Sequence, residues 1–238
     1  FAVEGARGLG YDGVSAETGN DVRGVEIGAF DTEQIRPAAE RDAQQQFDES
    51  SFRPAVVSWA KGTYGDAIAP NGRPVWQNFV AWFGDSQAVD SAGAPLVVYH
   101  GTRGSFDTFS LDLVGGNTDS GMFGKGFYFT ANPDEASHYA RGESPSIMPV
   151  YLSLQNPFET SNYKDFPSFP EPQTIEEMLS ADVDYSKNLR QALIDMGHDG
   201  VIFTRANGEN EYVAFYAEQI KSATGNQGTF DPNDPRID

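Results

Sequence analysis

Three short segments of this chain hold residues whose types and spacing could do chemistry. In the first, His100 and Gly101 follow an apolar run, and histidine occurs only 3 times in 238 residues. We expect a strand over Leu96–His100, and a glycine at the mouth of a strand lets a ligand approach the backbone closely. For an isolated His-Gly pair, the alternative interpretation is a structural histidine beside a turn.

The second segment contains Tyr128 and Tyr139, which lie eleven residues apart. We expect Tyr128 on a strand and Tyr139 on the next helix, so their rings could form the two walls of a slot for a flat aromatic ring. The alternative is that both rings belong to the core. The glycines on either side of Lys125 resemble half of a phosphate-binding loop, but the complete GxxxxGK[ST] pattern is absent from the segment.

The third segment places Glu211 at the entry of the apolar run Tyr212–Phe215, two residues after Glu209. A carboxylate at the entry of a strand could belong to a site. The alternative interpretation is a solvated residue of a turn. Each segment alone is therefore ambiguous, and the case for a site depends on their order along the chain.

The elements that must position these residues are a mixture of strands and helices. Patterns of apolar residues, caps and turn residues predict them. The expected strands are Leu96–His100, Phe127–Thr130, Pro149–Leu154, Val201–Thr204 and Tyr212–Phe215, the last two forming a hairpin. The expected helices are Pro74–Phe83, Glu135–Tyr139 (capped by Asn132 or Asp134), Ile175–Leu179 and Leu189–Met196. Strands and helices do not alternate regularly, which favours an α+β fold over a parallel doubly wound sheet.

The composition restricts the possible partners and chemistries. The net charge of −19 argues against bulk electrostatic binding to DNA, RNA or an anionic membrane, although a local site for a small anion remains possible. The absence of cysteine excludes disulfides, a cysteine nucleophile and cysteine metal ligands. We see no signal peptide, no membrane-spanning run and no convincing cluster of metal ligands.

The chain also contains an internal similarity. Residues 9–14 resemble residues 196–201 at an offset of 187, and residues 26–36 resemble residues 211–221 at an offset of 185. Chance similarity is the alternative. We predict that residues 1–37 form a partial hairpin like the one near the C-terminus, and that residues 38–72 are a linker or helical connector.

The ordered set of His-Gly, Gly-x-Tyr-Phe with a second Tyr, and Asn-Glu-Tyr resembles the ADP-ribosyltransferase superfamily. It is most similar to the diphtheria-toxin-like, poly(ADP-ribose) polymerase-like branch with its His-Tyr-Glu triad. Residues 82–86, 97–102 and 219–226 are also similar to the ADP-ribosyltransferase domains of phage polyvalent proteins. The resemblance covers about Pro74 to Ile237, so residues 73–238 would be the catalytic domain and residues 1–37 part of a preceding transferase-like repeat. It implies a split β-sandwich of two antiparallel sheets with flanking helices and an NAD cleft between them.

The resemblance also implies roles for individual residues. His100 would form a hydrogen bond with the adenosine-side ribose of NAD. Gly101 would pair its backbone N–H and C=O with the nicotinamide amide. Tyr128 and Tyr139 would sandwich the nicotinamide ring. Glu211 would be the catalytic carboxylate, so the candidate catalytic residues are Glu211, His100 and Tyr128. Such a carboxylate stabilises the oxocarbenium-like state formed when the nicotinamide–ribose bond breaks, and no metal is required.

Further candidate contacts to NAD are Thr102, Arg103 and Ser137. Arg103 and Lys125 could bind the pyrophosphate, although Arg103 could equally be an ordinary surface residue. In the polymerase branch a serine that helps hold the nicotinamide amide stands three residues before the second Tyr; here that position is Ala136, and Ser137 follows it.

The pair Glu209 and Glu211 also fits the Glu-x-Glu motif of arginine-modifying relatives. Those relatives carry Arg at the first motif and a Ser-Thr-Ser strand at the second, and neither occurs at the matching places. The His-Tyr-Glu interpretation is therefore preferred, and Glu209 could still face the acceptor.

These inferences together predict an NAD-dependent mono-ADP-ribosyltransferase, a toxin or effector that modifies a macromolecular acceptor. A host protein is favoured over nucleic acid because the chain is acidic. Action in the cytoplasm is expected because NAD is plentiful inside cells, and the resemblance to phage proteins implies the cytoplasm of a bacterial host. One alternative is an NAD glycohydrolase, with water as the acceptor. Another is a catalytically silent module that binds NAD or a partner.

Overall fold

The computed structural model describes residues 13–17, 25–29, 47–114, 121–141, 144–168 and 175–238. The chain divides into two compact units, Phe1–Phe47 and Asp48–Asp238. Of the predicted connector, residues 38–46 lie outside the described residues. The predicted domain boundaries at residues 37 and 73 stay predictions, and the larger compact unit begins before the second of them.

The first unit contains a two-stranded antiparallel sheet of β1 (Gly13–Glu17) and β2 (Val25–Ala29). Its register pairs residue 13 with 29 and residue 16 with 26. In the second unit, β7 (Gly200–Thr204) and β8 (Asn210–Ala214) pair residue 200 with 214 and residue 203 with 211. Offsets of 187 and 185 convert one hairpin into the other, so the two hairpins correspond in both bounds and register.

The second unit is built on a seven-stranded sheet in the order β6-β7-β8-β4-β3-β5-β9. Its other strands are β3 (Val98–Thr102), β4 (Phe127–Thr130), β5 (Ser146–Leu152), β6 (Phe158–Thr160) and β9 (Ile220–Ser222). Neighbouring strands are antiparallel, except that β6 and β7 are parallel. β3 meets β4 at one residue pair, Tyr99 with Thr130, whereas β3 pairs with β5 along its whole length. The sheet is therefore split between β3 and β4.

The two halves of the sheet share one hydrophobic core. Buried side chains from β3, β5 and β9 pack with buried side chains from β4, β7 and β8, and partly buried Phe106, Leu111 and Val114 pack against them. The sheet therefore curls so that its two halves face each other across this core, as the two layers of a sandwich do. This arrangement confirms the predicted α+β class and its split sheet, with β6–β7 as the one parallel pair.

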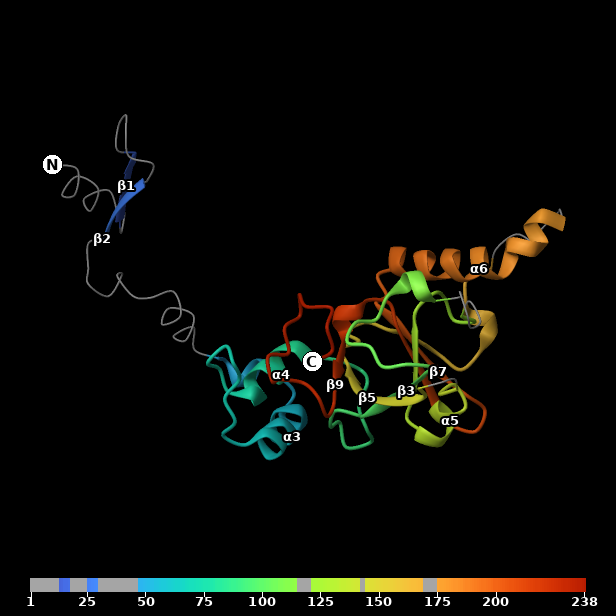
Figure 1. Ribbon diagram of the computed structural model, residues 1–238, viewed down its shortest axis with the longest axis horizontal. Coiled ribbons are helices and arrows are strands. Elements are labelled where there is room, and N and C mark those ends of the chain that lie inside the picture. The colour runs from blue at the N-terminus through green and yellow to red at the C-terminus, as the bar shows by residue number, and fades with distance from the viewer. Residues whose placement is uncertain (1–12, 18–24, 30–46, 115–120, 142–143, 169–174) are drawn as a thin grey trace. The chain divides into compact units, whose positions relative to one another are not determined.

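The α-helices of the described residues that pack around the sheet are α3 (Pro54–Tyr64), α4 (Val75–Phe83), α5 (Pro133–Ser137) and α6 (Ile175–Asp195). Short 3-10 helices cover Glu49–Ser51, Leu111–Leu113, Tyr163–Asp165 and Ala217–Gln219. Figure 1 shows α6 along one side of the sheet and α3 and α4 beside β9. Aromatic rings join α3 and α4 to β5: Trp59 and Phe79 each lie 5.3 Å from Tyr151.

The expectation of two helices over 175–179 and 189–196 is wrong, because α6 runs without a break from Ile175 to Asp195. Between the two expected helices lie Asp, Ser and Asn residues, each of which is less favourable than Ala in a helix by only about 0.5 kcal/mol. Leu189 and Leu193 are fully buried against the strand residues Val213 and Phe203, which anchors the helix. Tertiary packing therefore overrides the weak local propensity.

The segment after β4 also differs from its prediction. α5 begins and ends two residues earlier than expected, because Pro133 occupies its first turn and Asn132 caps it by accepting a hydrogen bond from the amide of Asp134 at 3.0 Å. Tyr139 consequently lies beyond the end of the helix.

Candidate functional site

Strand register brings Gly101, Tyr128 and Glu211 onto one face of the sheet. Thr130 of β4 pairs with Glu211 of β8 on one side and with Tyr99 of β3 on the other. Directly opposed residues point to the same face, and so do residues two apart along a strand. Tyr128 and Gly101 therefore share the face of Glu211. We call this surface the α5 face, because α5 packs on it beside β3 and β4.

The backbone of Gly101 faces the gap where the sheet splits. Pro149 lies opposite Tyr99, and its carbonyl accepts a hydrogen bond from Ala223, on the side away from β3. Because bonded and non-bonded pairs alternate in an antiparallel ladder, Tyr99 and Gly101 must direct their N–H and C=O groups away from β5, toward β4. β4 pairs with Tyr99 but not with Gly101. A donor and an acceptor thus face an opening between two strands.

Close packing against α5 explains why residue 101 is glycine. A methyl group there would overlap the carbonyl oxygen of Ala136 and lie 3.0 Å from the Cβ atom of Tyr139. Sequence reasoning attributed this glycine to a ligand, and the helix supplies a second reason. The same contact holds Tyr139 beside Gly101, with 60% of the tyrosine exposed.

Tyr128 is anchored by its hydroxyl group. The hydroxyl accepts a hydrogen bond from the amide of Phe123 at 2.9 Å and donates one to the carbonyl of Gly124 at 2.8 Å. Its ring stacks on Phe123 with centroids 6.4 Å apart. Within the described residues, no ring contact joins Tyr128 to Tyr139, so the predicted sandwich of a nicotinamide ring stays a prediction.

His100 projects from β3 to the face opposite the α5 face. Its ring lies 5.1 Å from that of Phe109 and 5.5 Å from that of Phe129, and its Nδ1 atom is 2.8 Å from the carbonyl oxygen of Tyr128. Since a carbonyl only accepts, Nδ1 must carry the proton. Burial lowers the pKa of His100, although the bond to Tyr128 opposes the shift. The neutral ring carries a lone pair on Nε2, and this atom makes no hydrogen bond within the described residues.

Glu211 is held by an arginine that sequence reasoning missed. Its Oε2 atom accepts hydrogen bonds from Arg205 Nη2 at 2.7 Å and Nε at 3.2 Å. Arg205 Nη1 bonds Glu135 of α5, whose other oxygen accepts a bond from Thr130 Oγ1 at 2.7 Å. The hairpin could have suggested this pair, because Arg205 and Glu211 flank the same β7–β8 turn.

The charges in this cluster stabilise one another. Hydrogen bonds to Glu135 and Glu211 raise the pKa of Arg205 above its ordinary value, although burial opposes the shift. Burial by itself would raise the pKa of Glu135, but the hydrogen bonds from Arg205 and Thr130 lower it overall. Arg205 and Glu135 are therefore both charged near neutral pH.

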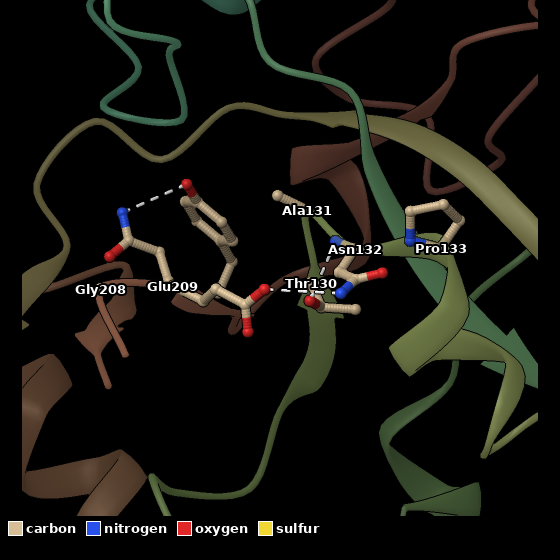
Figure 2. A pocket seen from close by; sticks show the side chains of 8 residues that line it. Thr130, Ala131, Asn132, Pro133, Gly208 and Glu209 are labelled. Atoms are coloured by element: carbon tan, nitrogen blue, oxygen red, sulfur yellow. Dashed lines mark hydrogen bonds between the residues drawn. The ribbon is translucent and has the colours of Figure 1, made fainter. Parts of the chain in front are cut away.

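A pocket of about 440 Å³ opens beside this cluster, between the end of β4 and the β7–β8 turn (Figure 2). Its lining is Thr130, Ala131, Asn132, Pro133, Gly208, Glu209, Asn210 and Tyr212. The exposed carboxylate of Glu209 lies 3.4 Å from Asn132 Nδ2 and 2.7 Å from Asn207 Nδ2. The pocket thus offers a carboxylate and amide groups to a ligand.

The remaining predicted residues are less closely tied to this surface. The hydroxyl of Ser137 donates to the carbonyl of Asp134 at 2.6 Å, within α5. Arg103 is exposed, and Thr102 lies at the end of β3. Lys125 is half-buried in the loop before β4, where its amide bonds the carbonyl of Ser186 at 2.8 Å. None of these positions by itself defines a contact to NAD.

Neither a metal site nor a membrane-spanning helix is evident among the residues that the structure describes. They contain no group of three or more His, Asp or Glu side chains arranged to hold a metal ion. Among them, no helix has the length and apolar character needed to cross a membrane.

Comparison with known protein families gives a match over the part of the chain that contains this surface. A family model described as ADP-ribosyltransferase in polyvalent proteins matches residues 90–230, more than half of the chain. The matched range includes β3, β4, α5 and β8, which carry the residues of the α5 face. No protein with curated function matches the sequence.

Proposed function

Because the chain belongs to the family of ADP-ribosyltransferases of polyvalent proteins, we propose that it uses NAD as its substrate and transfers ADP-ribose to a macromolecular acceptor. The observation that carries this proposal is the state of Glu211. Arg205 holds its Oε2 atom, while its Oε1 atom accepts no hydrogen bond from the described part of the chain. A fixed carboxylate with one free oxygen is suited to a substrate hydroxyl.

NAD would bind where the sheet splits. In our proposal the N–H and C=O of Gly101 pair with the nicotinamide carboxamide, and the exposed ring of Tyr139 forms one wall beside it. Tyr128 forms the opposite wall and is held in place by its bonded hydroxyl. On the other side of β3, His100 Nε2 accepts a hydrogen bond from a hydroxyl group of the adenosine-side ribose.

The reaction would break the bond between C1′ of the ribose and the nicotinamide nitrogen. The electron pair of that bond goes to the pyridinium nitrogen, so nicotinamide leaves neutral and needs no general acid. Positive charge develops on the ribose, as in glycoside cleavage. Glu211 Oε1 accepts a bond from the 2′-hydroxyl and stabilises this charge where it forms. The acceptor nucleophile then bonds to C1′ and loses a proton.

We place the acceptor at the pocket lined by Glu209, which lies two residues before Glu211, in the turn that leads into β8. A carboxylate and amides there would hydrogen-bond a donor group of the acceptor. A protein acceptor is favoured over DNA or RNA, because the net charge of −19 repels a polyphosphate backbone.

The test is transfer from NAD that carries a label on its adenosine part, in a bacterial lysate. We expect acid-insoluble label that a protease removes and nucleases do not. Label removed by nucleases would contradict a protein acceptor. Nicotinamide release without insoluble label would indicate an NAD glycohydrolase, and NAD binding without nicotinamide release would indicate a silent binding module.

A further inference from the structure

We infer that Arg205 is a positioning residue for Glu211: it holds Oε2 of that carboxylate and thereby directs Oε1 toward the substrate. This inference rests on the proposed function. Both of the Arg205 nitrogens that reach Glu211 bond the same oxygen, at 2.7 and 3.2 Å. This carboxylate has one fixed orientation, because rotation about the Cγ–Cδ bond of Glu211 would break both hydrogen bonds to Arg205.

Arg205 is itself fixed at its backbone. It is the first residue after β7, and its amide bonds the carbonyl of Glu209 at 2.9 Å, while its own carbonyl accepts a bond from the amide of Gly208 at 2.9 Å. Gly208 supplies the positive φ of 84° that closes this turn. The turn therefore sets the direction from which the guanidinium approaches Glu211.

The far end of the guanidinium is fixed by α5. Arg205 Nη1 bonds Glu135, and Glu135 is held in turn by Thr130 Oγ1 at 2.7 Å. α5 is also the helix that packs on Gly101 and leads to Tyr139. One arginine thus connects the proposed wall of the nicotinamide site to the proposed catalytic carboxylate.

Burial and charge separate this cluster from an ordinary surface ion pair. The side chains of Glu211, Arg205 and Glu135 are 18%, 32% and 22% exposed. The ion pair of Arg236 with Asp234 is similarly short, at 2.6 Å, but its arginine is 58% exposed. Without Arg205, two partly buried carboxylates would face each other, and their repulsion would turn Glu211 away from its orientation.

The test compares R205M, R205K and E135Q with wild type, measuring kcat and KM for nicotinamide release from NAD. Because a displacement of about 1 Å costs roughly 100-fold in rate, we expect R205M to lower kcat by about that factor. KM should change little, since Gly101 and Tyr139 keep their places. R205K should recover part of the loss, because it restores a cation without the two-nitrogen contact.

R236M is the matched control, because it removes an equally short arginine–carboxylate pair elsewhere, and it should keep wild-type kcat. Wild-type or increased kcat in R205M would overturn the inference. If R205M does not fold, E135Q decides: lower kcat at unchanged KM supports positioning, and wild-type kcat overturns it. Absence of nicotinamide release by folded wild type that binds NAD would instead overturn the proposed function, and the inference with it.

Discussion

The two oxygens of Glu211 differ in what they contact. Oε2 is committed to Arg205, and Oε1 accepts nothing from the described residues. This asymmetry is compatible with the role proposed for Glu211, because a catalytic carboxylate must be held in place and must also have an oxygen that can contact the substrate. The alternative interpretation, a solvated residue of a turn, does not describe Glu211, because its side chain is only 18% exposed.

Protonation of His100 should weaken NAD binding at acid pH. Burial lowers the pKa of this histidine below its ordinary value near 6.5, so the ring is neutral at pH 7, the state in which Nε2 could accept the proposed hydrogen bond from a ribose hydroxyl. As the pH falls through the lowered pKa, Nε2 gains a proton and can no longer accept. We expect calorimetry to show an NAD Kd that is constant above about pH 6.5 and rises below that lowered pKa.

The lowered pKa of His100 also determines how the free energy of unfolding changes with pH. The unfolded chain binds the proton near pH 6.5, before the folded protein does, so the free energy of unfolding should decrease as the pH falls below that value. The variant H100Q cannot titrate and should lose both dependences. An equal loss of NAD binding at low pH in H100Q would show that another group is responsible.

Removal of the Tyr139 ring should separate binding from stability. The side chain is 60% exposed, so Y139A should change the free energy of unfolding by no more than about 0.5 kcal/mol. If the ring stacks on nicotinamide, the KM for NAD should rise at least several-fold, while Y139F stays close to wild type. An unchanged KM in Y139A would remove Tyr139 from the site.

The order of motifs along the sequence predicted candidate site residues, but it did not predict the contacts that these residues make. Glu211 and Gly101 could be proposed from the sequence because each was expected at a strand end in a recognisable motif. Arg205 and Glu135 were missed because a charged residue in a turn or at a helix start is ordinary, and only the fold brings them together. The placement of His100 on the opposite face also needed the strand register.

The contact between β3 and α5 is the element-scale feature on which the site depends. The helix approaches Gly101 so closely that no side chain fits, and it carries Tyr139 to the edge of the gap between β3 and β4. The gap itself exists because β3 pairs with β4 at one residue pair. Strand separation and helix approach therefore create the opening together.

Substitution of Gly101 tests this contact. In G101A the new methyl would overlap the backbone carbonyl of Ala136, which cannot move as a flexible side chain could. We expect a loss of about 1–3 kcal/mol in the free energy of unfolding, together with weaker NAD binding. The measurements are chemical denaturation and calorimetry.

The matched control is G62A, in helix α3, where no atom lies within 4 Å of the added methyl. Alanine in that helix should stabilise the protein by about 0.5–1 kcal/mol. Equal stability of G101A and wild type would show that α5 does not press on this residue.

The sequence predicted most elements because local patterns and tertiary packing agree in them. The β7–β8 hairpin and the helix at Pro74–Phe83 appear within one residue at each end and, for the second hairpin strand, within two. The continuous helix α6 could not be predicted, since its central residues have weak helical propensity and its anchoring contacts come from distant strands. The split between β3 and β4 came from the family resemblance, because no local pattern records which strands fail to pair.

At the scale of the whole molecule, the chain contains the same hairpin register twice. Glu26 occupies in β2 the position of Glu211 in β8, opposite residue 16 rather than residue 203. In the described part of the chain, β1 and β2 form a sheet of two strands, whereas β8 lies between β7 and β4. The two positions therefore differ in their described surroundings, because β4 pairs with β8 beside Glu211, and Glu135 of α5 bonds the arginine that holds Glu211.

The proposed role of Glu211 is tested most directly by the rate of nicotinamide release from NAD by wild type, E211Q and E26Q. E211Q should be slower by about 10²–10³-fold, the usual effect of losing one fixed group that stabilises transition-state charge. E26Q makes the same chemical change at the corresponding position of the other hairpin and should match wild type. Wild-type rates in E211Q, or loss of activity in E26Q alone, would contradict the account.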